Sequence, residues 1–293
     1  MTMPRTLTQP TATHAWYQLL RQLLLDGQPI GPRGMATREV LNATIAFPMR
    51  YPVICCPARK LSYKFMAAEA LWVTAGNDKA ADIVPYNKHM AEFSDDGETF
   101  AGAYGPPWVD QLDYLLRTLG NDQQTRQAVV TLWRPNPKPS KDIPCTVALT
   151  FNIRDNKLNC HVFMRSSDIW LGVPYDFFTF TMMATKLRCI YNDTNRQRVQ
   201  PGLLYFTAVS SHLYDRDLEQ VKLVNDELRL TVNGPLARSY DYPMREPTLM
   251  LETPKPKPWE FYRRSLLACR DLKPTRQLEI EGLWRIRYDA VDG

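Results

Sequence analysis

The sequence predicts an α+β protein with one mixed β-sheet covered by helices. Segments with the apolar spacing of helices and segments with that of strands follow one another irregularly, without the strict alternation that builds a parallel α/β sheet. The 293 residues are 44% hydrophobic and 23% charged, a globular composition that allows a sizeable core. No internal repeat is present. We therefore treat residues 1–293 as a single domain.

The N-terminal half begins with a polar segment, residues 1–13, that we expect to be loose. Two later segments have apolar residues at helical spacing and end at Gly27 and Gly76, as helices commonly do. In chain order we expect a helix at 15–27, a Gly/Pro turn at 31–40, strands at 42–49 and 51–56, a helix at 61–76, a loop-rich stretch at 77–108 and a helix at 109–122.

The C-terminal half contains a predicted hairpin, in which two strands flank the turn "RDNK" at 154–157. From residue 243 to the end the chain is rich in Pro and Lys, as expected of a surface arm. In chain order we expect strands at 128–133, 146–153 and 158–166, a largely buried helix at 175–193, a strand at 203–214 and a helix at 215–226.

Charge and cysteine usage exclude several classes of protein. Lys and Arg total 36 against 31 Asp and Glu, and this excess of +5 suits an anionic ligand but is too small to indicate direct nucleic-acid binding. There is no apolar run long enough to span a membrane and no secretory signal, so we expect a soluble cytoplasmic protein. The six cysteines form no CxxC pair, which favours a reduced protein.

Most short catalytic motifs are absent. The chain has no GxGxxG, no P-loop, no HExxH and no GxSxG. Its four histidines are scattered without the spacing of metal ligands, so we expect no bound metal. Taken alone, Cys145 has two interpretations: a small buried residue of a strand, or a nucleophile whose thiolate is favoured by Arg165 and Arg126 on neighbouring strands.

Five segments, in order and spread over most of the chain, together resemble the thymidylate synthase superfamily. They are "EALWVTAG", "AYGPPW", "TRQAVVTLW", the run "PCTVALTFNIRDNKLNCHVFMRSSDIWLGVPYD" and "SHLY". The resemblance implies the family's fold, with a face of the sheet used to form a homodimer that has shared active sites. It also implies two substrates, a pyrimidine nucleoside monophosphate and a folate.

The resemblance implies roles for three catalytic residues. Cys145 is the nucleophile that adds to C6 of the pyrimidine, which makes C5 electron-rich enough to attack a one-carbon unit. Glu69 is the general acid and base that works through water, a task that a raised pKa would suit; alone it could equally be an exposed helix residue. Tyr104 assists removal of the C5 proton.

The same resemblance implies a binding site for each substrate. Arg33, Arg126 and Arg165, with the Ser166 hydroxyl, match the phosphate-binding set, and guanidinium groups suit phosphate oxygens. Arg126 is expected to come from the partner subunit, and Gln127 stands where the family often has a second arginine. His212 and Tyr214 match the residues that hold the 3′-hydroxyl. The folate, 5,10-methylenetetrahydrofolate, is expected at Trp72, Asp168 and Gly172.

Asp176 indicates which base is read. Thymidylate synthases have Asn here, because an amide can accept from uracil N3–H and donate to O4, whereas an ionised carboxylate can only accept. Cytosine offers a 4-amino donor, and its N3 gains a proton in the adduct. Asp at this position, with Thr146 where His is usual, resembles the deoxycytidylate hydroxymethylases of phages. A structural alternative is that Asp176 caps the helix that follows.

The product depends on what captures the exocyclic methylene intermediate. Thymidylate synthases shield it with an indole, and the corresponding segment here, residues 82–97, has no tryptophan, which favours capture by water. Against this, residues 278–293 resemble the family's C-terminal tail, which closes over the site. We therefore expect a dCMP hydroxymethylase. The alternatives are a dCMP methyltransferase, a CMP hydroxymethylase, a thymidylate synthase and a non-catalytic nucleotide-binding or RNA-binding module.

Overall fold

One six-stranded sheet forms the centre of the protein. The computed structural model describes residues 7–233 and 258–271. The strands are arranged in the order β1-β2-β6-β5-β4-β3, in which β5 and β6 are parallel and every other neighbouring pair is antiparallel. This sheet confirms the predicted α+β class. The strands are β1 (Gln28–Ile30), β2 (Thr37–Pro48), β3 (Val129–Thr131), β4 (Thr146–Arg154), β5 (Lys157–Asp168) and β6 (Gln200–Tyr214).

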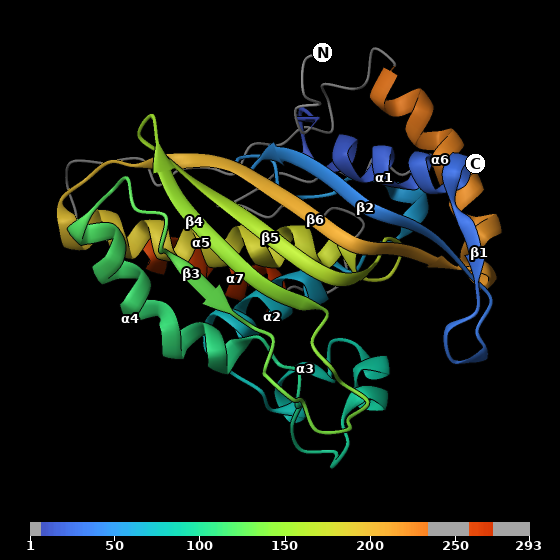
Figure 1. Ribbon diagram of the computed structural model, residues 1–293, viewed down its shortest axis with the longest axis horizontal. Helices are drawn as coiled ribbons and strands as arrows, with labels where there is room; N and C mark the ends of the chain where they lie inside the picture. Colours follow the sequence, from blue (N-terminus) through green and yellow to red (C-terminus); the bar gives the residue numbers. More distant parts are fainter. Residues whose placement is uncertain (1–6, 234–257, 272–293) are drawn as a thin grey trace.

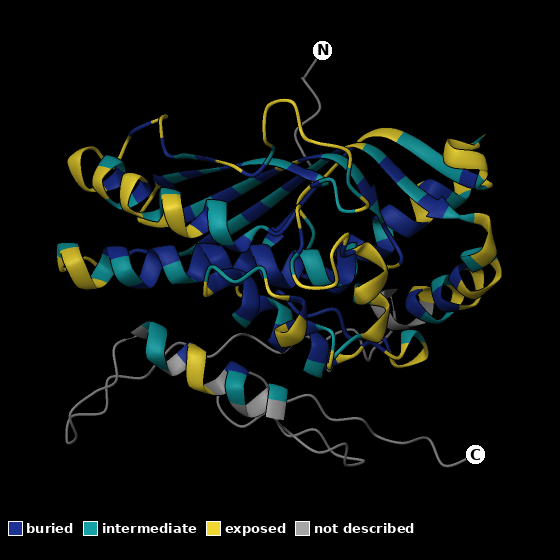
Figure 2. Cartoon of the chain, turned by 90° about the horizontal axis from the view of Figure 1, so that it is seen from below, coloured by how far each residue is buried: buried dark blue, intermediate teal, exposed yellow. Residues whose placement is uncertain are grey.

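Helices cover one face of the sheet (Figure 1). The central helix α5 lies directly against the sheet and is mostly buried, while α7 lies farther out on the same side (Figure 2). None of the helices within 7–233 and 258–271 is both long and apolar enough to cross a bilayer. The helices are α1 (Ala12–Asp26), α2 (Tyr63–Thr74), α3 (Ala80–Ile83), α4 (Gly105–Asn121), α5 (Val173–Asn195), α6 (Leu218–Asn233) and α7 (Pro258–Asp271).

The hairpin of β4 and β5 forms where the sequence predicts it. Asp155 and Asn156 both have positive φ, 50° and 57°, the backbone that a two-residue type I′ turn requires and that Asp and Asn tolerate. The turn fixes the register as far as Ala148 opposite Phe163, and an irregularity between Thr146 and Ala148 then shifts the pairing so that Thr146 lies opposite Met164. Cys145 thereby lies next to Arg165, whose backbone N–H donates to the Cys145 carbonyl at 2.9 Å.

Helix α5 connects the two parallel strands. A parallel pair needs a crossover, and the buried helix predicted at 175–193 supplies it. A short turn joins the end of β5 to the first turn of α5. This turn places Asp168, at the end of β5, near Asp176, in the first turn of α5, so that the charge of Asp168 acts on Asp176.

The structure differs from the sequence predictions in three segments. Residues 37–40, expected to belong to the Gly/Pro turn, form the start of strand β2. Residues 51–56 form no strand, although residues 52–56 are buried: they have no sheet neighbour, and the Cys55 N–H donates to Thr13 Oγ1 at 3.0 Å. Burial alone therefore produced the strand-like pattern. Helix α4 begins four residues before the predicted start, because Pro106 and Pro107 occupy its first turn, where proline's missing N–H costs nothing. The short edge strand β1 was not predicted.

The two ends of the chain are partly described. Thr8 bridges to Ala46, and α1 begins at Ala12 with Thr11 as its cap, so ordered structure starts inside the segment expected to be loose. Within the predicted arm at 243–293, α7 packs against α2 and α5 and buries Tyr262 and Leu266. The rest of that arm, including the expected closing tail at 278–293, lies outside the described residues.

Trp16 ties α1 to the turn that leads into α5. Its Nε1–H donates to the Ile169 carbonyl at 2.6 Å, and its ring stacks on Trp170 with centroids 6.0 Å apart. The side chain is fully buried.

We predict that Trp16→Phe lowers the free energy of unfolding by about 1–3 kcal/mol, because a buried carbonyl loses its donor. Leu25→Ala, on the exposed face of the same helix, should change it by less than about 0.5 kcal/mol. Urea denaturation of both variants measures the difference. Equal stability of Trp16→Phe and the wild type would show that the hydrogen bond does not hold the turn.

Candidate active site

A cavity of about 230 Å³ opens beside Cys145. Its wall combines one thiol, three carboxyl groups and a set of aromatic and aliphatic side chains. The residues that line it are Glu69, Trp72, Val73, Met90, Phe93, Phe100, Gly102, Ala103, Tyr104, Asp142, Ile143, Pro144, Cys145, Asp176 and Thr179. Among the predicted catalytic residues, Cys145, Glu69, Tyr104 and Asp176 therefore lie together.

Arg165 holds the segment that carries the thiol. Its Nε donates to the Pro144 carbonyl and its Nη2 to the Ile143 carbonyl, both at 2.9 Å, and Nη2 lies 3.8 Å from the Cys145 Sγ. The guanidinium also lies 5.7 Å from the centroid of the Trp133 ring. Cys145 is half-buried, whereas Cys55, Cys56, Cys160 and Cys189 are buried. It is thus the thiol among these five that lines the cavity.

The pKa of the Cys145 thiol is raised, because burial outweighs the opposing charge of Arg165. The carboxyl groups of Asp176 and Asp142 raise it further. The sequence interpretation, in which nearby cations favour the thiolate, therefore holds only for the contribution of Arg165. A raised pKa makes the thiol harder to ionise, so formation of a thiolate needs a change in these surroundings.

Two carboxyl groups of the cavity wall, Glu69 and Asp176, have strongly raised pKa values. Burial and then the charge of Asp176 raise the pKa of Glu69 to about 8, although Thr179 donates to its Oε2 at 3.3 Å. Burial and then the charge of Asp168 raise the pKa of Asp176 to about 7. Groups that exchange protons near pH 7 are suited to general acid–base work.

Asp176 does not cap its helix. Gly172 occupies the capping position without a side-chain hydrogen bond, and Asp176 lies in the first turn, where its own N–H donates to the Gly172 carbonyl. A Cβ on Gly172 would stand 3.2 Å from Asp176 Oδ2, so the glycine leaves room for the carboxylate. The structural alternative for Asp176 is therefore not supported within the described residues.

The Tyr-Gly loop places Tyr104 on the cavity wall. Gly105 packs so closely that a Cβ there would stand 2.4 Å from the Asn77 carbonyl oxygen, so only glycine fits. The Tyr104 ring stacks on Phe180 with centroids 6.1 Å apart. Burial raises the pKa of Tyr104 well above its usual value, and the charges of Asp176 and Cys145 add to this.

Four predicted substrate residues form a line at the ends of β5 and β6. Ser166 Oγ lies 3.3 Å from His212 Nδ1, and the His212 ring meets Tyr214 edge-on with centroids 5.6 Å apart. The exposed Arg33 donates to the Tyr214 hydroxyl at 3.5 Å. Hydroxyl, imidazole, phenol and guanidinium groups thus follow one another from the sheet to the surface.

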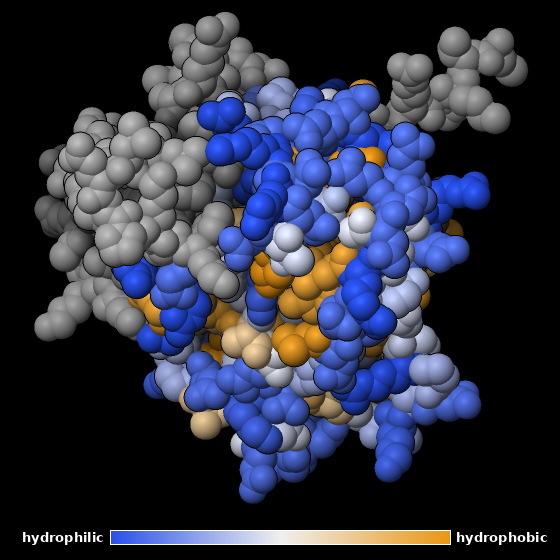
Figure 3. Space-filling view, turned by 90° about the vertical axis from the view of Figure 1, so that its left-hand side faces the viewer, coloured by the Kyte–Doolittle hydropathy of each residue, from blue (hydrophilic) through white to orange (hydrophobic). Residues whose placement is uncertain are grey.

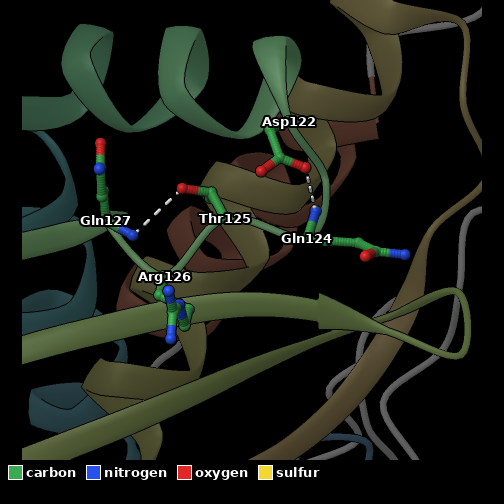
Figure 4. A pocket seen from close by; sticks show the side chains of 5 residues that line it. All are labelled: Asp122, Gln124, Thr125, Arg126 and Gln127. Atoms are coloured by element: carbon green, nitrogen blue, oxygen red, sulfur yellow. Dashed lines mark hydrogen bonds between the residues drawn. The ribbon is translucent and has the colours of Figure 1, made fainter.

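Arg126 lies elsewhere. It was expected on a strand, but it occupies the loop between α4 and β3, where a shallow pocket is lined by Asp122, Gln124, Thr125, Arg126 and Gln127. Figure 3 views this end of the molecule, where polar side chains surround a central apolar area. Figure 4 shows the Arg126 and Gln127 side chains pointing in different directions.

The distance along β4 separates Arg126 from the cavity. The Phe151 N–H donates to the Ala128 carbonyl, and Arg154 donates to the carbonyls of the loop at Gln123 and Gln124. Six residues separate Cys145 from Phe151, which is roughly 20 Å along a strand. Within one chain, Arg126 therefore cannot share a phosphate with Arg165.

The three predicted folate residues divide into two groups. Trp72 lines the cavity, with its Nε1–H donated to the Lys79 carbonyl at 3.1 Å and its ring edge-on to Phe100. Asp168 Oδ1 accepts the N–H groups of Trp170 and Leu171, both at 2.8 Å, and so holds the turn before α5. Neither Asp168 nor Gly172 is among the described residues that line the cavity.

Sequence reasoning missed Asp142 and Thr179. Asp142 precedes Cys145 by three residues and Thr179 follows Asp176 by three, so each is close in sequence to a residue that was predicted. That spacing was the available signal. Within the described ranges no group of three or more His, Cys, Asp or Glu side chains is arranged to hold a metal ion.

We predict that Glu69→Gln changes the pH dependence of stability. The pKa of Glu69 is higher in the folded protein, about 8, than the ordinary 4.5, so its favourable contribution is complete below pH 4.5 and is lost as the pH rises through about 8. The free energy of unfolding of Glu69→Gln, relative to wild type, should rise by at least about 1 kcal/mol between pH 5 and pH 8.5. Denaturation at both pH values measures this.

The control for this prediction is Glu98→Gln, at an exposed glutamate outside the cavity. It should show no comparable change between the two pH values. A stability difference for Glu69→Gln that is the same at pH 5 and pH 8.5 would contradict the buried, proton-binding carboxyl described here.

Comparison with known proteins agrees with this geometry. The family model described as thymidylate synthase matches residues 14–233. A curated relative, the deoxyuridylate hydroxymethyltransferase of Bacillus phage SP01, is 31% identical over 181 residues, which cover 55% of this chain and 47% of the relative. The chain therefore spans about half the length of that relative. The matched region contains the cavity, its thiol and the line of predicted substrate residues, and the chain belongs to the thymidylate synthase family.

Proposed function

We propose that this protein transfers a one-carbon unit to C5 of deoxycytidylate (dCMP) and that water completes the reaction to give the 5-hydroxymethyl nucleotide. The observation that carries this proposal is the position of Asp176. Its carboxyl group does not cap helix α5 and lines the same cavity as Cys145 and Glu69. In outline, the thiol activates the ring, Glu69 moves protons and Asp176 reads the base.

The cavity suits a flat pyrimidine and a second flat ring. Trp72, Phe93 and Phe100 supply apolar surface on one side of the thiol. When bound, 5,10-methylenetetrahydrofolate supplies the one-carbon unit. The residues of this chain bind, orient and move protons: the Cys145 Sγ bonds to C6, and Glu69, with a pKa of about 8, exchanges protons through water.

Asp176 is matched to cytosine by its protonation as well as its position. Neutral cytosine presents an acceptor at N3 beside a donor at the 4-amino group, and a protonated carboxyl offers the complementary donor and acceptor. With a pKa of about 7, Asp176 can hold this proton in the free enzyme and pass it to N3 as the thiolate adds to C6. A uracil ring already carries its N3 proton and does not need this transfer.

Capture by water is supported by the cavity wall. The segment where thymidylate synthases carry a shielding indole contributes Met90 and Phe93 here. Phe93 is 48% exposed, so the wall is open to solvent at that point. The relative from phage SP01 is named as a hydroxymethyltransferase, which favours the same outcome. A methyl product, formed by hydride capture, is the alternative outcome at this step.

Deoxyuridylate is the second candidate substrate, because the name of that relative specifies it. A protonated Asp176 could also donate to O4 and accept from N3–H of uracil. Binding of cytosine and of uracil differs once Asp176 is ionised, since a carboxylate repels the uracil O4. CMP remains an alternative to dCMP, because no residue identified here reads the 2′-hydroxyl.

We further propose a homodimer in which each chain completes the other's site. Alternate residues of β5 and β6 are buried under α5, while those between them, including Phe163 and Val209, face away and are 46% and 44% exposed. Exposed apolar side chains on a sheet face are suited to an interface between two copies. Arg165 comes next after Phe163 in the same alternation, so this face also carries one of the proposed phosphate ligands.

The direct test is product analysis. Purified protein is incubated with methylenetetrahydrofolate and dCMP, CMP or dUMP, and the nucleotides are weighed by mass spectrometry. We expect hydroxymethyl-dCMP as the main product and none from Cys145→Ser. A protein that binds nucleotides but forms no new product from any of the three would be a non-catalytic binding module.

We predict that Asp176→Asn shifts the base preference toward uracil. The amide always offers a donor and an acceptor and cannot pass a proton to cytosine N3. A hydrogen bond to a charged group is worth roughly 1.5–3 kcal/mol, so the ratio of kcat/KM for dCMP to that for dUMP should fall at least about tenfold. Ser166 and the arginines should bind both nucleotides as before. An unchanged ratio would mean that the base is read elsewhere.

We predict that two inactive variants restore activity when mixed. Arg126→Ala and Cys145→Ser are each inactive if every site needs Arg126 from one subunit and Cys145 from the other. Random exchange of subunits makes half of the dimers mixed, each with one intact site, so about a quarter of wild-type activity should return. Mixing followed by an activity assay measures this. If nothing returns although the subunits exchange, Arg126 serves its own chain or neither.

A further inference from the structure

We infer that Asp142 holds the water molecule that completes the reaction. This inference rests on the proposed function, because it assigns the water that distinguishes a hydroxymethyl from a methyl product. Asp142 lines the same cavity as Cys145 and precedes it by three residues. It is the one carboxyl group of this wall to which the proposed mechanism gives no role.

The side chain is fixed at the cavity by a close backbone approach. The Gly102 N–H donates to Asp142 Oδ2 at 2.7 Å. A Cβ on Gly102 would stand 2.5 Å from the Asp142 carbonyl oxygen and 2.9 Å from Oδ1, so only glycine allows this arrangement. Gly102 lines the cavity two residues before Tyr104, so the contact joins the Tyr-Gly loop to the segment of the nucleophile.

The carboxylate has more hydrogen-bonding capacity than its protein neighbours use. An ionised carboxylate offers about four acceptor positions, and Gly102 fills one of them. The wall beside it is apolar, formed by Phe100, Ile143 and Pro144. A carboxylate in such surroundings binds water at its remaining positions, since an unsatisfied polar group is costly to bury.

Two contacts of Asp142 favour the ionised form that takes a proton from that water. Burial and the charge of Asp95 raise the pKa of Asp142, whereas the Gly102 N–H and the charge of Arg134 lower it. For Glu69 and Asp176, burial and a neighbouring carboxyl group raise the pKa to about 8 and about 7. The hydrogen bond from Gly102 thus places an acceptor oxygen of Asp142 at the cavity wall.

The step balances without an oxidant or a reductant. The water oxygen bonds to the exocyclic carbon attached to C5, and the proton of the water passes to the Asp142 carboxylate. The electron pair of the exocyclic double bond moves into the ring. Expulsion of the Cys145 thiolate from C6 then restores the 5,6 double bond and releases the hydroxymethyl nucleotide.

A second set of hydrogen bonds between the same two segments provides a matched control. The exposed Asp95 accepts from Ser140 Oγ at 2.5 Å and from the Lys141 N–H at 3.0 Å, which ties the same two segments together outside the cavity. Asp142→Asn keeps an oxygen that accepts from Gly102 and removes the charge. Asp95→Asn loosens this outer contact and leaves the residues of the cavity wall unchanged. It also removes a charge that raises the pKa of Asp142, which favours the ionised form of Asp142.

The experiment compares the two variants with wild type, using dCMP and methylenetetrahydrofolate. It measures formation of hydroxymethyl and methyl products and exchange of the C5 hydrogen with solvent. Asp142→Asn should lose at least about tenfold in hydroxymethyl turnover and should shift the remaining product toward methyl or an unreleased adduct. Its C5 exchange should stay within about threefold of wild type, because the thiol and Glu69 are intact. Asp95→Asn should keep the wild-type product ratio.

Two outcomes would overturn the inference alone. Either Asp142→Asn keeps wild-type hydroxymethyl turnover, or it loses turnover and C5 exchange in equal proportion, as a merely structural residue would. A wild-type enzyme that forms only the methyl product would overturn the proposed function, and the assignment of a water to Asp142 would fall with it. The wild-type product therefore separates the two failures.

Discussion

Burial of acidic groups around one small cavity is the constraint on which the proposed chemistry depends. Glu69, Asp142, Asp176 and the Cys145 thiol all line this cavity, and burial raises the pKa of each of them. Each anion makes the next one more costly, so the groups cannot all ionise together. Protons must therefore be distributed among them, and a bound base that accepts a proton at N3 changes that distribution.

The fold supplies this arrangement through a few short connections. The β4–β5 turn, together with the register shift between Thr146 and Ala148, puts Arg165 against the carbonyls of Ile143 and Pro144, and so orients the thiol. The crossover from β5 through α5 brings Asp176 to the same cavity. Two glycines complete the arrangement. Gly102 and Gly105 let the backbone of Asp142 and of Asn77 approach more closely than a side chain would allow.

Most of the fold and the centre of the site could be predicted from the sequence, because local patterns carry them. The "RDNK" turn, the buried helix α5 and the ordered motifs around Cys145 are properties of short segments. The strand predicted at residues 51–56 was wrong because a buried segment outside the sheet has the same run of apolar residues as a buried strand. Asp142 was missed because its importance comes from Gly102, forty residues away in the chain. The net rise in the pKa of Cys145 depends on burial, which no motif reports.

Exchange of the C5 hydrogen tests the central claim most directly, because C5 becomes exchangeable only after a thiolate has added to C6. In heavy water with tetrahydrofolate present, mass spectrometry of the recovered nucleotide should show deuterium in dCMP with the wild type and none with Cys145→Ser. Deuterium should enter dUMP more slowly than dCMP. Equal exchange by wild type and Cys145→Ser, or exchange of dUMP alone, would contradict a cytosine-specific covalent mechanism at this cavity.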